Sequence, residues 1–216
     1  MKVTDIITRT LELLGEINPL DTESELSPNS LPVEGLIVSY LDQAVEDVFL
    51  QAPAYTLPWC ELPGPVVPHG DGSGHIVLPD DCMGRFVIRL HGWRREVTRV
   101  ITPDDALYAL QRNPVTRGGT ERPVCVSTVD DEGRPVLEYY SLPVRVRNPS
   151  AEKMLYVRRV TVPRSRESYA GYEIGGSPRL LTPVAVRCAY YVSLSLGNAA
   201  MTSWCEQETT KQILRL

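Results

Sequence analysis

The sequence lacks the features that mark membrane and secreted proteins. No apolar run reaches membrane-spanning length without an Arg or Asn inside it. The first nine residues carry charges where a secretory signal peptide needs an unbroken apolar stretch. The cysteines are odd in number and form no CxxC pair: Cys60, Cys82, Cys125, Cys188 and Cys205. We therefore expect reduced thiols, no membrane partner and assembly in a cytoplasm.

Motifs of catalysis and cofactor binding are also missing. The sequence contains no GxSxG, no Cys-His motif and no Walker pattern. Gly70, Gly72 and Gly74 resemble a phosphate-binding loop, but such a loop needs a helix after it, and here a strand is predicted. Three carboxylate pairs each stand beside a Pro or Gly, which is typical of turns and caps: Asp80-Asp81, Asp104-Asp105 and Asp130-Asp131. We expect neither catalysis nor a cofactor.

Four potential metal ligands occur within 23 residues: Cys60, His69, His75 and Cys82. Zinc ligands usually come as close pairs on a turn, and these four match no such spacing. We therefore predict no metal site and interpret the four as loop and strand-end residues.

Lysine is scarce, and charge is unevenly distributed along the chain. Residues 1–81 hold 2 basic and 14 acidic residues, whereas residues 82–216 hold 20 basic and 13 acidic ones. The basic residues of the second part are nearly all Arg, which makes planar bidentate pairs and is favoured at interfaces and on phosphate. The asymmetry has two readings: a solvated surface, or opposite charges that meet between neighbouring subunits.

The second reading gives seven candidate contact residues. A basic side would meet an acidic side of a neighbouring copy, or would line a channel for DNA. The basic candidates are Arg94, Arg95, Arg158 and Arg159, and the acidic ones are Asp42, Glu46 and Asp47. No helix-turn-helix, zinc-finger or RNP pattern accompanies the arginines, and the chain has a net charge of −5. We expect at most non-specific contact with DNA.

Hydrophobic periodicity predicts helices at both ends of the chain. Apolar residues at helical spacing predict a helix over 3–14 that ends at Gly15, followed by an exposed acidic loop over 16–30. A second helix should begin at the Ser30 cap and stop near Gln51. A long final helix should run from 182 to about 213, with a kink or break at Gly197-Asn198.

The middle of the chain alternates short apolar runs with turns. Strands are predicted over 75–79, 85–91, 94–101 and 154–162, with a hairpin over 124–129 and 134–140. A short helix should follow Thr102-Pro103, and loops should cover 52–74, 113–123 and 163–181. The predicted fold is α+β: a helical bundle of residues 1–52 and 182–216, with an inserted antiparallel β-rich lobe over 53–181.

The order of these elements resembles a known family of phage proteins. The resemblance covers most of the chain. It includes a helix with Leu41-Asp42-Gln43-Ala44 near its middle, then the stretch from Ile76 to Met83 that leads into 86–93. A hairpin strand over 133–142, the run 151–157 and a closing helix from Pro183 complete the set. The sequence thereby looks like the head-to-tail adaptor, or ring, proteins of short-tailed phages, in particular crAss-like phages.

The resemblance implies a structural virion protein without enzymatic activity. Such proteins form dodecameric rings below the portal in the neck of the tail, contact portal and other tail or ring proteins, and let the genome DNA pass through the lumen. Assembly would take place in the host cytoplasm. The alternatives are a tail-completion or stopper protein, and a hydrolase or nuclease that uses Asp80 and Asp81 with His75 or His91.

Overall fold

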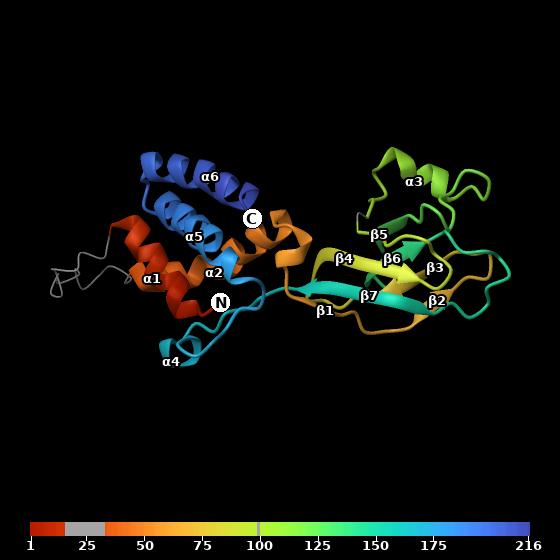
Figure 1. The fold of residues 1–216 in the computed structure, drawn as a ribbon, viewed down its shortest axis with the longest axis horizontal. Coiled ribbons are helices and arrows are strands. Elements are labelled where there is room, and N and C mark those ends of the chain that lie inside the picture. The colour runs from red at the N-terminus through yellow and green to blue at the C-terminus, as the bar shows by residue number, and fades with distance from the viewer. Residues whose placement is uncertain (16–32, 99) are drawn as a thin grey trace. The chain divides into compact units, whose positions relative to one another are not determined.

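The computed structural model describes residues 1–15, 33–98 and 100–216. The α+β class expected from the sequence is confirmed: helices from the two ends of the chain and antiparallel sheets from its middle make up the fold (Figure 1). The chain divides into two compact units. The helical unit comprises Met1–Pro58 and Arg159–Leu216, and the β unit comprises Trp59–Arg158.

These boundaries differ from the predicted ones by two segments. Residues 53–58 and 159–181 belong to the helical unit, because they are bonded to it. Val162 donates its backbone N–H to Asp42 at 2.8 Å. Further along, the Tyr169 hydroxyl donates to Glu34 at 2.6 Å. These contacts join residues far apart in the sequence, and hydrophobic periodicity does not report them.

The described part of the helical unit contains four longer helices: α1 (Val3–Leu14), α2 (Val33–Gln51), α5 (Leu181–Ser195) and α6 (Ala199–Leu214). Helix α5 packs against the other three, and its small buried residues, such as Ala185 and Ala189, permit that close approach. Short helices α4 (Arg166–Tyr169), η1 (Ala54–Thr56) and η2 (Pro178–Leu180) lie in the connections.

Within the described residues, two predicted helix ends are found where the sequence placed them. Gly15 ends α1 in a left-handed conformation with φ 74°, as predicted. The expected break at Gly197-Asn198 is confirmed: Gly197 has φ 72°, and the Asn198 side chain caps α6 by accepting from the Met201 N–H at 3.1 Å. The Ser30 cap and the loop over 16–30 lie outside the described residues.

The β unit contains two antiparallel sheets. One has the order β1-β7-β4, formed by Trp59–Glu61, Ala151–Arg158 and Cys82–Leu90. The other has the order β2-β3-β6-β5, formed by Val66–Pro68, Gly74–Val77, Pro135–Tyr139 and Cys125–Val129. Helix α3 (Ala106–Gln111) begins at Asp105, whose side chain accepts from the Leu107 N–H. The predicted hairpin is confirmed as β5 and β6.

Three predictions for the middle of the chain were wrong. The Pro-rich segment over 52–74 is not a loop throughout, because it contains η1, β1 and β2. In the segment 94–101, the described residues (all but 99) form isolated bridges at Val97 and Ile101 and no strand. Helix α4 and η2 occupy part of the third predicted loop. The runs over 75–79 and 85–91 are strands β3 and β4, but they belong to different sheets.

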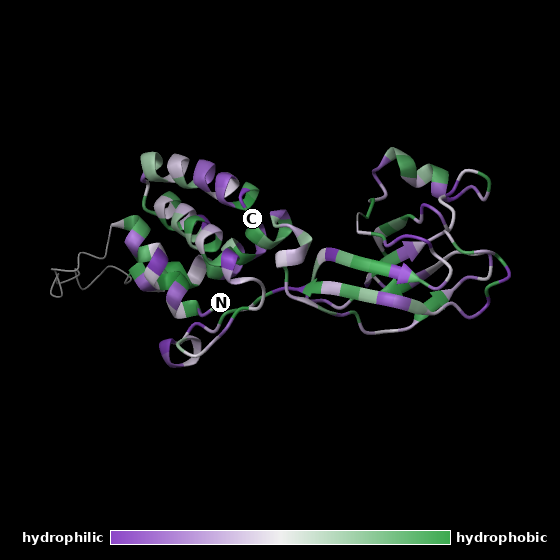
Figure 2. Ribbon diagram, in the orientation of Figure 1, coloured by the Kyte–Doolittle hydropathy of each residue, from purple (hydrophilic) through white to green (hydrophobic). Residues whose placement is uncertain are grey.

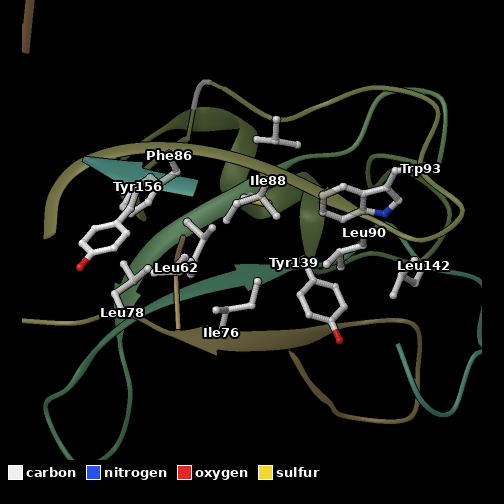
Figure 3. Packing of buried hydrophobic residues seen from close by; sticks show 13 residues of the cluster. Leu62, Ile76, Leu78, Phe86, Ile88, Leu90, Trp93, Tyr139, Leu142 and Tyr156 are labelled. Atoms are coloured by element: carbon white, nitrogen blue, oxygen red, sulfur yellow. The ribbon is translucent and has the colours of Figure 1, made fainter. Parts of the chain in front are cut away.

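Side chains from both sheets form the core of the β unit (Figure 3). Trp93 is fully buried against Tyr139, with an edge-to-face geometry and ring centroids 6.3 Å apart. Its indole N–H donates to the Ser141 carbonyl at 3.2 Å, so the buried polar atom is satisfied. This core supports the loops at one end of the β unit.

Candidate functional site

The acidic residues of α2 hold neighbouring segments of their own chain. Asp42 and Glu46 are one helical turn apart and therefore lie on the same face. Besides Val162, Asp42 accepts from Arg164 at 2.8 Å. Glu46 lies 3.6 Å from the guanidinium of Arg159. Two of the predicted interface carboxylates thus attach the segment after β7 to α2.

Asp47, the third predicted carboxylate, belongs to a half-buried network with α5. It accepts from Arg187 Nη2 at 2.6 Å and from the Tyr191 hydroxyl. The same guanidinium lies over the rings of Tyr190 and Tyr191, 4.5 and 5.0 Å from their centroids. Burial alone would lower the pKa of Arg187, but its hydrogen bond and charge interaction with Asp47 raise that pKa overall.

The predicted arginines of the β unit also have partners inside the unit. Arg158 lies 2.9 Å from Asp81, and the Tyr156 hydroxyl donates to the same carboxylate at 3.2 Å. The hydrogen bond from Arg158 to Tyr156 raises the pKa of this arginine. Arg94 pairs with Glu121 at 2.9 Å, and both side chains are exposed.

The structure therefore places the seven predicted contact residues as follows. Arg159 meets Glu46, which is the predicted pairing of charges, but it does so within one chain. Among these seven residues, only Arg95 is exposed without an ion pair to any residue that the structure describes. The sequence prediction missed Arg164 and Arg187. The spacing of Arg187 and Tyr191, one turn apart on α5, is the only local signal for the second of them.

The groups invoked for the enzymatic alternative are separated. His91 follows one end of β4 and pairs with Glu152 at 3.4 Å, whereas Asp81 precedes the other end of the same strand. Nine extended residues span about 30 Å at 3.3 Å per residue. His75 shares a hydrogen bond of 3.0 Å with His69, across the β2–β3 pair. The contacts of Asp81 in the described residues are with Arg158 and Tyr156, and no hydrogen bond or ion pair joins it to a histidine there.

Within the described ranges, no group of three or more His, Cys, Asp or Glu side chains is placed to hold a metal ion. Cys60, one of the four candidate ligands, donates its thiol to the Tyr156 carbonyl at 3.3 Å. None of the helices in these ranges has the length and apolar character needed to span a membrane.

Exposed apolar side chains gather where α5 meets α6. We call this surface the α5–α6 corner: Leu194 and Leu196, with exposed fractions of 55% and 58%. A hollow of about 290 Å³ lies there, lined in part by Leu194, Ala199 and Glu206. Apolar colours mark both ends of α6, whereas its middle is polar (Figure 2). Clustered exposed apolar residues are typical of contact surfaces.

No protein-family model matches this sequence, and no curated protein matches it.

Proposed function

We propose that this chain is a structural virion protein, a head-to-tail adaptor that forms an oligomeric ring between portal and tail around the DNA channel. Its partners are other copies of itself, the portal, other tail or ring proteins, and passing genome DNA held without sequence preference. In this proposal it needs no cofactor and catalyses no reaction, and it resides in the neck of the virion after assembly in the host cytoplasm.

The observation that carries the proposal is the arrangement of the units along the chain. Both terminal segments belong to one helical unit, and the β unit is inserted between Pro58 and Arg159. Helix–helix–β–helix is also the element order on which the resemblance to phage adaptors is based. A closed ring needs two different contact faces on each subunit, and two units of different composition offer them.

The polar contacts of the described residues support a structural role. Asp42 and Asp47 of α2 accept from Val162, Arg164 and Arg187, so these carboxylates hold segments of the helical unit together. General acid–base catalysis requires two titratable groups that converge on one substrate. The α5–α6 corner adds an apolar surface of the kind buried in stable assemblies.

The proposal is tested by the mass of the purified protein, alone and co-expressed with the portal protein of the same genome. Native mass spectrometry should give a ring with many copies of the chain. Leu194→Asp places a charge in the α5–α6 corner and should reduce the ring to smaller species. Val129→Asp, at a similarly exposed valine of the β unit, is the matched control and should leave the ring intact. A monomer under every condition would refute the proposal.

A further inference from the structure

Four loops meet at one end of the β unit: residues 69–73, 91–95, 112–122 and 141–147. We call their outer face the arginine-loop surface. The Leu142 N–H donates to the Gly72 carbonyl at 3.1 Å, and the Arg94 N–H donates to the Thr120 carbonyl at 2.9 Å. The Arg117 guanidinium donates to the Asp71 carbonyl at 2.7 Å. These bonds make the four loops one surface.

The surface is strongly basic, and all its cationic residues are arginines: Arg94, Arg95, Arg112, Arg117, Arg122, Arg145 and Arg147. The same four loops contain two carboxylates, so their net charge is +5. Asp71 is bonded to Ser73, and Glu121 is paired with Arg94. The other six arginines form no ion pair with a carboxylate in the described parts of the chain, although Arg112 and Arg117 interact at longer range with Glu138 and Asp71. The surface therefore keeps an excess of positive charge.

A hollow of about 230 Å³ lies between the loops 112–122 and 141–147, and Arg117 is the one arginine among its described lining residues. Pro114 and Pro143 also line the hollow. Each of these prolines is followed in the chain by an exposed valine. Val115 is 90% exposed and Val144 is 61% exposed. The hollow is smaller than the roughly 300–1,000 Å³ of small-molecule sites, so it suits one or two aliphatic side chains.

The loops around the hollow are closely packed. A Cβ at Gly72 would collide with the Leu142 carbonyl, and one at Gly118 would come within 2.7 Å of the Arg122 carbonyl. The backbone at both positions therefore requires glycine. A site built in this way is preformed, which lowers the entropic cost of binding.

The chemistry of the surface favours a protein partner over nucleic acid. Arginine is enriched and lysine depleted at protein interfaces, and lysine is absent from these loops. Exposed valines beside the hollow would gain nothing from a phosphate backbone, but they would bury apolar area against aliphatic side chains. The matching partner carries several carboxylates, no cation and a few aliphatic residues.

Residues 16–31 of the chain have this composition. They include four carboxylates and no basic residue, together with the aliphatic Ile17, Leu20, Leu26 and Leu31. We infer that the arginine-loop surface of one copy binds residues 16–31 of a second copy. The inference rests on the proposed assembly of copies, and it supplies a heterologous contact of the kind that closes a ring.

The probe is a fluorescein-labelled synthetic peptide of residues 16–31, and the measurement is its anisotropy on titration with the full chain. The host protein carries Asp21→Asn, Glu23→Gln and Glu25→Gln, so its own segment competes little. Saturable binding is expected at 150 mM NaCl. Arg145→Glu and Val144→Ser should each weaken it about tenfold, in line with the loss of one charged or one apolar contact.

Two controls match these variants. Arg179→Glu makes the same charge change at an exposed arginine of the helical unit, and Val129→Ser makes the same apolar loss at a valine 64% exposed. Both should bind the peptide as the host does. A peptide with amides at its four carboxylates should not bind.

Three outcomes would overturn the inference: no peptide binding, binding unaffected by Arg145→Glu and Val144→Ser, or displacement of the labelled peptide by a 20-base-pair DNA duplex at lower concentrations than by unlabelled peptide. The result is independent of the ring measurement. Rings without peptide binding would refute this contact and leave the proposed function in place. Peptide binding without rings would refute the proposed function alone.

Discussion

The ion pair of Asp47 and Arg187 is the least exposed one in the described parts of the chain, with side chains 25% and 20% exposed. It joins α2 to α5 together with Tyr191, whose hydroxyl donates to the same carboxylate. Truncating one member of such a pair leaves the other charge desolvated and unpaired. The network therefore matters for the stability of the helical unit.

Arg187→Ala should lower the free energy of unfolding by about 2–3 kcal/mol, because Asp47 loses its cation and Tyr190 its cation–π contact. Urea unfolding followed by circular dichroism at pH 7 measures the change. Arg179→Ala, at an exposed arginine, should cost less than about 0.5 kcal/mol. Equal losses in the two variants would contradict the role given to the network.

Buried thiols make the stability sensitive to alkali. Burial raises the pKa of Cys205 from 9.0 to about 11 and that of Cys188 to about 12. Between pH 9 and 11 these thiols ionise in the unfolded chain but stay protonated in the native one. The free energy of unfolding should therefore fall as pH rises through this window, by about 1–2 kcal/mol for Cys205.

Urea unfolding at pH 8.5 and pH 11 checks this prediction, with Cys205→Ala as the comparison. The variant should lose less stability over the same interval, since it has no thiol to ionise at that position. An identical loss in both proteins would show that Cys205 does not contribute. At pH 8 a thiol reagent should reach only the half-buried Cys60 and Cys82 in the native protein.

Residues whose role is local were predictable from the sequence, and those that act across the chain were not. Gly15 and Asp105 end or begin helices through their own backbone neighbours, so composition reveals them. Asp47 and Arg187 are 140 residues apart, and helical periodicity shows only that Asp47 lies on a polar face. The same limit applies to the arginine-loop surface, which four separate segments build.

At the scale of elements, long helices were easier to predict than short strands. The helical spacing of apolar residues predicts α2, and Gly197-Asn198 predicts the break between α5 and α6. Strands β1 and β2 have three residues each and lie among prolines. They are too short to show the alternation of apolar and polar residues by which a strand is recognised. Strand β4 pairs with β7 about 70 residues later, and no turn signal fixes that choice.

The cap of α6 gives a test at this scale. Asn198→Ala removes the acceptor for the Met201 N–H and should lower the free energy of unfolding by about 1 kcal/mol. Asn198→Asp keeps the acceptor and should cost little. Chemical denaturation of both variants separates a capping role from general sensitivity at this position. Similar losses for Ala and Asp would contradict the capping role.

At the scale of the whole molecule, the β unit has a core of its own, drawn from both sheets. A fragment of residues 59–158 should therefore fold alone and unfold cooperatively in urea. Trp93→Ala in that fragment should cost about 3–5 kcal/mol, because it removes the largest fully buried side chain. A fragment with no cooperative transition would show that the β unit depends on the rest of the chain.

The charge asymmetry had two readings, a solvated surface and a contact between subunits, and several of the candidate contact residues are already paired within one subunit. Reversing Arg158 and Arg159 to Glu would place like charges beside Asp81 and Glu46, so it would destabilise the fold as well as any assembly. Variants of Arg145 or Leu194 probe assembly without breaking an internal ion pair.

The central claim is that copies of this chain form a ring, and the mass of the assembly tests it most directly. Native mass spectrometry of the protein co-purified with its portal should show a closed ring. Twelve copies would have a mass of about 290 kDa, twelve times 24.1 kDa. A chain that stays at 24.1 kDa, alone and with the portal, would contradict the proposed function.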